Sequence, residues 1–517
     1  MTKKSLAQKL TLTLLCLGLS GLSYSAETTS TSSTTQDKKE DKTPEAKVFT
    51  SKHQITIDGK SLAYTATAGT MLIKNNKDEP IALFGFTAYV KDGGEQKNRP
   101  IMFAYNGGPG SSSAWLHMGI MGPKRAVLKD LDVNSRGPFN TVDNEFSIVD
   151  HADLVMIDPI GTGFSRPIGK GEGKDFWGVD QDIKSVSSFI VQYVSQNNRW
   201  ASPKFVLGES YGGMRTGGVS YELLTHYNMA LNGIILVSPY LDFASGNAGI
   251  KIDTPYVNFL TTFASTAWYH NALAYRPAEL QPFLREVEAF ARDVYAPVLF
   301  KGVHASAEER QQVLAALEKY TGVKASYWDK ANLRMDEGHF LQELMRDKGI
   351  AIGRIDSRYQ GPNINGLSET TVYDPFGSAI APGLVAAFNS YYRQELKVES
   401  DREYQLSSGE VGMNWDDRHV QPDSGGMKVP APNTAVDLAY AMSLNPKMKV
   451  LIDSGYFDLA CPYGTVDFVV DHLDIPANIR GNITIEHYEA GHMMYIHPGS
   501  QPKFKKTLAD FVDSNSK

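Results

Sequence analysis

Residues 204–212 read Lys-Phe-Val-Leu-Gly-Glu-Ser-Tyr-Gly. The apolar residues before Gly208 are typical of a buried strand, and a serine between two glycines follows at once. Small flanking residues permit the sharp strand-to-helix turn that exposes a nucleophilic hydroxyl. We therefore expect Ser210 to be a nucleophile at the start of a helix that extends through Met214 to Tyr227.

Other apolar runs of the same kind occur on both sides of this stretch. Helical spacing separates them at Asp180–Val194, which Asp180 or Asp182 could cap, and a closing helix is expected around Phe504–Val512. This alternation predicts an α/β fold with a mostly parallel central sheet and helices on both faces. The expected strands of this core are Ile101–Tyr105, Asp153–Ile157, Gly233–Val237, Met448–Ile452 and Ile483–Tyr488. Before them we expect a hairpin, His53–Ile57 and Leu62–Ala66 around Asp58-Gly59, and a strand at Ile81–Val90.

The alternation of predicted strands and helices stops between about residues 250 and 430. This region carries helical patterns at Pro277–Tyr295, Ala307–Tyr320 and His339–Lys348, followed by Gly/Pro-rich stretches. We interpret residues 48–250 and 431–517 as two parts of one core, and residues 251–430 as an inserted helical cap over the carboxyl ends of the strands, where open α/β sheets bind ligands.

The N-terminus has the features of an export signal. Lysines precede an apolar run from Leu10 to Leu22, and Ser23-Tyr24-Ser25 offers a cleavage site, so residues 1–25 are predicted to be a signal peptide of bacterial type. An uncleaved anchor is the alternative. Residues 26–47 are Ser/Thr-rich and then charged, which predicts a disordered linker. Export to the periplasm or the medium follows, without membrane attachment after cleavage.

Composition limits the possible partners. The chain of 517 residues has a net charge of −7 and no long basic block, which argues against nucleic-acid binding. Of its two cysteines, Cys16 lies in the signal, so Cys461 would be the one thiol of the mature protein. Neither a metal nor an organic cofactor is indicated, and the oligomeric state is left open.

A serine nucleophile needs a base and a group that orients the base. His492, in Gly491-His492-Met493, follows the predicted last strand, where this chemistry places its histidine. The orienting acid should follow the preceding strand, and the loop position favours Asp458 over Asp453, which ends that strand. The regular spacing of His487, His492 and His497 does not favour a zinc site, because a strand end would not bring them together.

A glycine loop, residues 106–112, follows the Ile101–Tyr105 strand and reads Asn-Gly-Gly-Pro-Gly-Ser-Ser. Glycines let backbone amides approach a ligand, so an N–H of this loop is a candidate donor to a developing oxyanion. The second donor would be the amide of Tyr211. A plain Gly/Pro turn is the alternative interpretation.

Four segments together resemble the serine carboxypeptidase family, whose members have the α/β-hydrolase fold. They are the glycine loop, Gly208-Glu209-Ser210-Tyr211, the aspartate loop at Asp458, and Gly491-His492-Met493. The resemblance implies a Ser210-Asp458-His492 triad that removes C-terminal residues from peptides through an acyl-enzyme. It also implies oxyanion amides at Gly108 and Tyr211, and a site for the substrate carboxylate formed by Asn106, Gly107 and Glu209.

Two further residues are pocket candidates on the same basis, Cys461 and Met493, although an inert core cysteine is equally compatible with the sequence. The chain also departs from the family pattern. Ala104 replaces a tryptophan before the glycine loop, and Gly119-Ile120-Met121-Gly122-Pro123 lacks the glutamate often found before its Gly-Pro. An esterase or acyltransferase with the same triad is the alternative function, and an inactive hydrolase-fold binding module is a second.

Overall fold

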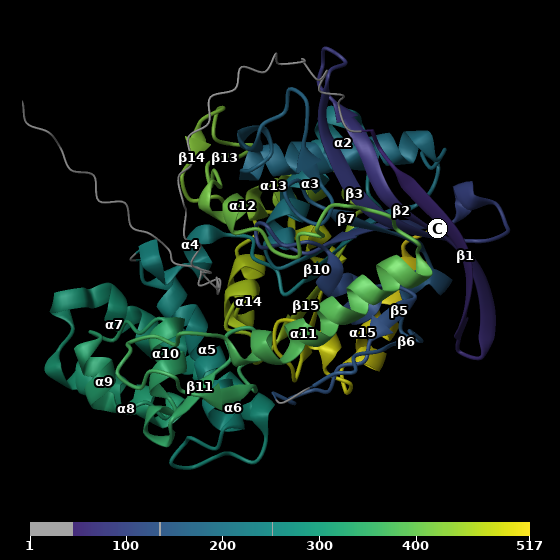
Figure 1. The fold of residues 1–517 in the computed structure, drawn as a ribbon. Coiled ribbons are helices and arrows are strands. Elements are labelled where there is room, and N and C mark those ends of the chain that lie inside the picture. Colours follow the sequence, from purple (N-terminus) through teal and green to yellow (C-terminus); the bar gives the residue numbers. More distant parts are fainter. Residues whose placement is uncertain (1–44, 134–135, 251) are drawn as a thin grey trace, which may run out of the picture.

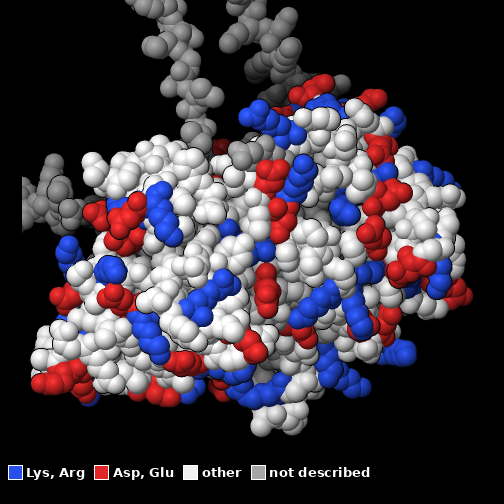
Figure 2. Space-filling model, turned by 90° about the horizontal axis from the view of Figure 1, so that it is seen from below, with Lys and Arg blue, Asp and Glu red and all other residues white. Residues whose placement is uncertain are grey.

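The computed structural model describes residues 45–133, 136–250 and 252–517. The predicted signal peptide, Cys16 and most of the predicted linker lie outside these residues. Within them, no helix has the length and apolar character needed to cross a bilayer. Lys and Arg side chains alternate with Asp and Glu over the face drawn in Figure 2, without a continuous basic surface there.

A ten-stranded sheet forms the centre of the molecule (Figure 1). Its main path runs β1-β2-β3-β7-β4-β9-β10-β15-β16, and the short β8 (Arg166–Pro167) pairs with β3. The first three strands are antiparallel, and β3 also pairs antiparallel with β7. From β7 to β16 every pairing is parallel. The bounds are β1 Val48–Ile57, β2 Lys60–Lys74, β3 Pro80–Lys91, β4 Ile101–Tyr105, β7 Asp153–Asp158, β9 Lys204–Glu209, β10 Gly233–Val237, β15 Lys449–Gly455 and β16 Ile483–Tyr488.

Helices cover both faces of this sheet. One face packs against α2 (Val179–Gln196), α3 (Tyr211–Tyr227), α13 (Ala435–Leu444) and α14 (Tyr463–Asp471). The other packs against α11 (Pro375–Ser390) and the closing helix α15 (Gln501–Ser514). The expected mostly parallel sheet between two helical layers is therefore confirmed.

A third hydrophobic cluster lies outside these layers (Figure 1, teal). It joins Phe457, Leu459 and Tyr463, which follow β15, to a group of helices from the middle of the chain. These are α5 (Thr254–Tyr269), α6 (Leu280–Phe290), α7 (Ala296–Lys301), α8 (Ala307–Thr321), α9 (Ala325–Lys330) and α10 (Glu337–Glu343). The helices thus pack beside the carboxyl end of β15, the neighbour of the edge strand β16.

Local signals placed most elements correctly, including the hairpin in which Ile57 pairs with Lys60 across Asp58-Gly59. The expected cap of α2 is wrong. Gly178 occupies the N-cap position, without a side-chain cap. Asp182 bonds Arg215 and Asp180 bonds His419, so both carboxylates serve long-range contacts.

Candidate active site

Ser210 lies at the turn between β9 and α3. Its backbone has φ 63° and ψ −128°, a strained conformation for a non-glycine residue, and its side chain is half-buried. A Cβ atom at Gly208 would lie 2.2 Å from the Gly212 carbonyl oxygen, so the turn requires glycine there. The sequence therefore produces the tight turn that presents a serine at the end of a parallel strand.

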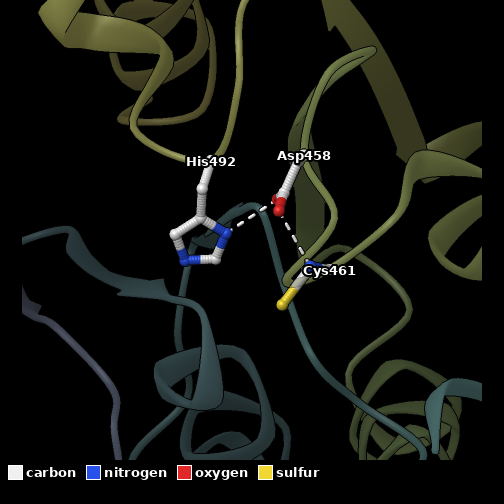
Figure 3. A group of neighbouring side chains, drawn as sticks. All are labelled: Asp458, Cys461 and His492. Atoms are coloured by element: carbon white, nitrogen blue, oxygen red, sulfur yellow. Dashed lines mark hydrogen bonds and ion pairs between the residues drawn. The ribbon is translucent and has the colours of Figure 1, made fainter. Parts of the chain in front are cut away.

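His492 and Asp458 form a buried pair (Figure 3). Nδ1 of His492 lies 2.7 Å from Oδ2 of Asp458, while Oδ1 of Asp458 accepts bonds from the amides of Ala460 and Cys461. Burial disfavours the imidazolium, but the Asp458 carboxylate outweighs it and raises the pKa of His492 well above its usual value. The carboxylate fixes the tautomer that leaves Nε2 facing away from it.

The end of β10 holds the serine and histidine segments together. The Ser210 amide donates to the Val237 carbonyl at 3.0 Å. The next residue, Ser238, donates its hydroxyl to the His492 carbonyl at 2.8 Å. Within the described ranges the Ser210 hydroxyl makes no hydrogen bond of its own. The structure thus brings the three predicted triad residues to one edge of the sheet, with the Asp458–His492 bond formed.

Residues 354–357, from the predicted inserted region, contact both loops of this pair. The Ile355 carbonyl accepts the amide of His492 at 2.8 Å, and the Arg354 carbonyl accepts that of Leu459 at 3.1 Å. The Gly491 amide donates to Asp356 Oδ2 at 3.2 Å. A Cβ atom at residue 491 would lie 2.4 Å from that of Asp356, which explains the glycine before His492.

The glycine loop lies against the serine turn. A Cβ atom at Gly107 would lie 2.5 Å from the Tyr211 amide nitrogen, so glycine leaves that amide accessible. Tyr211 is the first residue of α3, whose N–H has no partner within the helix. Gly108 is exposed with φ 109°, and no acceptor among the described residues takes its N–H. The Tyr211 amide therefore lies against the glycine loop, and neither predicted oxyanion amide has an acceptor among the described residues.

Glu209, Asn106 and Gly107 lie together next to Ser210, and Glu209 and Asn106 are each 3% exposed. Burial raises the pKa of Glu209 to about 7, against smaller lowering effects that include the nearby His492. Tyr495 donates its hydroxyl to Glu209 Oε2 at 2.7 Å, a contact that sequence analysis did not predict.

A buried ion pair joins α2 to α3, the helix that follows the serine turn, and contacts the glycine loop. Arg215 Nε lies 2.7 Å from Asp182 Oδ2, and Arg215 Nη1 donates to the Asn106 carbonyl at 2.8 Å. The guanidinium also lies over the rings of Tyr105 and Tyr211. No pattern in the sequence indicated this pair, because its members come from two different helices.

The two predicted pocket candidates have different positions. Cys461 is 4% exposed and lies beside Asp458 and His492, with the three possible ligand atoms within 4.8 Å of one another (Figure 3). Met493 is buried in the core on the α15 face.

The other histidines and the alternative acid have partners away from the triad. His487 contacts Asp467, and His497 contacts Asp130. Asp453, the alternative acid, accepts a hydrogen bond from Tyr488.

Comparison with known proteins identifies the family. The sequence profile of serine carboxypeptidases matches residues 62–332, slightly more than half of the chain. This chain belongs to the serine carboxypeptidase family. It is 29% identical over 154 residues to serine carboxypeptidase-like 10 of Arabidopsis thaliana, and 33% identical over 160 residues to the pheromone-processing carboxypeptidase KEX1 of Saccharomyces cerevisiae.

These alignments are partial. They cover 28% and 30% of this chain, and only 32% of the plant relative and 20% of the yeast relative. The crystal structure of yeast Kex1(Δ)p superposes with a TM-score of 0.52 at 16% identity, over 88% of this chain and 91% of the yeast chain. That similarity supports the fold described above, a mostly parallel sheet between two layers of helices.

Proposed function

We propose that this protein is an exported serine-type carboxypeptidase that removes single residues from the C-termini of peptides. The buried Asp458–His492 pair beside the strained Ser210 turn is the observation that supports this function most directly. Family membership supports the same class of reaction.

In the proposed reaction, Nε2 of His492 accepts the Ser210 proton as the hydroxyl oxygen attacks the scissile carbonyl carbon. The amides of Gly108 and Tyr211 donate to the oxyanion of the tetrahedral intermediate. His492 then protonates the departing amine, which leaves an acyl-enzyme on Ser210. Water deprotonated by His492 hydrolyses this ester and restores the serine.

Recognition of the substrate C-terminus would depend on Glu209 with Asn106 and Gly107. Glu209 is buried, and its pKa near 7 allows a protonated carboxyl over the acidic and neutral range. A protonated acid can donate to the substrate carboxylate, whereas an ionised one repels it. This arrangement favours free C-termini over the neutral esters that an esterase would prefer.

The test is to incubate peptides with free and amidated C-termini with the wild-type enzyme and Ser210→Ala, and to analyse the products by mass spectrometry. We expect stepwise release of C-terminal residues from free peptides only, and loss of release by at least about a thousandfold in Ser210→Ala. Ser220→Ala, in the same helix, is the matched control. Unchanged activity of Ser210→Ala would exclude the mechanism, and cleavage of esters alone would favour the esterase.

A further inference from the structure

The hydrogen bond between Tyr495 and Glu209 joins two residues that are 286 positions apart. Tyr495 is fully buried, and Glu209 directly precedes the proposed nucleophile. A buried carboxyl group has few possible partners, so the donor that meets it determines how it can face a ligand.

Tyr495 reaches Glu209 because Gly119 leaves room for its ring. A Cβ atom at Gly119 would lie 2.4 Å from the ring atom Cε2 of Tyr495. The surrounding stretch, residues 119–123, contains no acidic side chain. The ring therefore occupies the space over this stretch and brings a neutral phenol, not a second acid, to Glu209.

The orientation of Tyr495 is fixed at its backbone and its ring. Its carbonyl accepts a bond from the buried Gln501 side chain at 2.9 Å, and its ring packs near that of Phe504, with centroids 6.1 Å apart. Tyr495 also follows His492 by three residues in the same loop. The phenol has little freedom to turn to another acceptor.

The phenol is the donor in this hydrogen bond, which lies beside Asn106. Oδ1 of Asn106 accepts the Leu116 amide at 2.9 Å, which directs its NH₂ group to the opposite side. The Asn106 side chain lies close enough to lower the pKa values of both Glu209 and Tyr495. Burial and Glu209 raise the pKa of Tyr495 well above its usual value, so the phenol keeps its proton and donates a hydrogen bond to Glu209.

We propose that Tyr495 is a positioning residue that occupies Oε2 of Glu209 and thereby reserves Oε1 for the C-terminal carboxylate of the substrate. Because Oε2 accepts the hydrogen bond from Tyr495, the proton of the neutral Glu209 carboxyl is on Oε1. From there the O–H group donates a hydrogen bond to the substrate carboxylate, and the proton stays on Glu209. The inference rests on the proposed function and adds the side chain that orients the recognition group.

Removal of the phenol should also change the titration of Glu209. The charged groups that act on Glu209 are His492 and Asp458; Tyr495 donates a hydrogen bond to it, and the Asn106 side chain lies nearby. The phenol stabilises the ionised form more than the protonated one, because a donor bonds a carboxylate more strongly. In Tyr495→Phe the pKa of Glu209 should therefore rise, and the acid should remain protonated to higher pH.

The experiment is to measure KM and kcat between pH 5 and 9 for a peptide with a free C-terminus. In wild-type enzyme we expect KM to increase above about pH 7, where Glu209 ionises. In Tyr495→Phe the onset of this increase should move upward by about one pH unit. If the KM profile of Tyr495→Phe coincided with that of the wild-type enzyme, the role of Tyr495 would be overturned, and the proposed carboxypeptidase activity would be left intact.

Tyr488→Phe is the matched control. Tyr488 donates to a buried carboxyl, Asp453, at 2.9 Å, so the variant deletes the same kind of bond away from the proposed site. Its KM profile should match that of the wild type. An equal shift in Tyr488→Phe would show that the effect is merely structural and would overturn the proposal.

A second substitution keeps the shape of the ring. Site-specific 3-fluorotyrosine at residue 495 has a more acidic hydroxyl, so it should move the onset of the KM increase downward, even if Tyr495→Phe fails to fold. An unchanged or upward shift would contradict the assignment.

A direct titration separates this inference from the proposed function. The infrared carbonyl band of protonated Glu209, assigned as the band missing in Glu209→Gln, should titrate at higher pH in Tyr495→Phe than in wild-type enzyme. If wild-type enzyme releases no C-terminal residues, the proposed function fails, and this midpoint still tests the hydrogen bond. An identical midpoint in both proteins would overturn the inference.

Discussion

Nδ1 of His492 and Oδ2 of Asp458 are 2.7 Å apart in an environment from which water is almost excluded. The bond fixes one nitrogen of the imidazole and leaves the other for proton transfer. Because Asp458 is also held by the amides of Ala460 and Cys461, its orientation does not depend on the histidine.

Asp458→Asn should therefore lower kcat by about ten-thousandfold, because an amide can stabilise the wrong tautomer and carries no charge to balance the imidazolium. Steady-state kinetics on a free peptide would measure this loss. Asp453→Asn is the matched control, since Asp453 ends the same strand but bonds Tyr488, and its kcat should remain near that of wild type. Similar losses in both variants would contradict the assignment of the acid.

Glu209→Gln should remove the pH dependence of KM. Burial raises the pKa of Glu209 to about 7, so the acid is protonated below this pH and increasingly ionised above it. In wild-type enzyme KM should rise by about tenfold per pH unit above pH 7, since one proton is lost. The glutamine stays neutral, so its KM should be flat across this range. A persistent increase in KM for Glu209→Gln would assign the effect to another group.

Small thiol reagents should inactivate the enzyme slowly through Cys461. Burial raises the pKa of this thiol, so little thiolate is present at neutral pH and inactivation should accelerate as the pH increases. A modified sulfur beside His492 would obstruct the active site. Cys461→Ser should keep its activity and resist the reagent, and inactivation of that variant at the wild-type rate would exclude this explanation.

Arg215→Met should destabilise the protein by about 3–5 kcal/mol, because it leaves the buried Asp182 carboxylate without its partner. Denaturant unfolding would measure the change. Arg310→Met is the matched control, since the exposed ion pair with Asp329 should contribute less than about 1 kcal/mol. Equal free energies of unfolding for the two variants would show that the buried pair contributes no more to stability than the exposed one.

The order of strands and helices could be predicted because most of the parallel strands, such as Gly233–Val237, are short apolar runs buried on both faces. Ser210, Asp458 and His492 could be selected because each follows a predicted strand, and parallel strands bring such residues to the same edge of the sheet. The triad stays a prediction, of which the structure shows the contact between Asp458 and His492.

The contacts that orient these residues could not be predicted in the same way. The bonds from Tyr495 to Glu209 and from Gly491 to Asp356 depend on how distant segments pack in three dimensions. The N-cap of α2 was misassigned for the same reason, since Asp182 has a better partner in Arg215 than the helix end. Local propensity does not report such competition between partners.

Residues 354–356 supply acceptors to the backbones of both the aspartate and histidine loops. A minimal hydrolase made by deleting the middle of this chain would therefore lose part of the frame that aligns its own base. Replacing this middle region with that of another protein would carry the same risk. The exchange would also replace the contacts that hold the loops of Asp458 and His492.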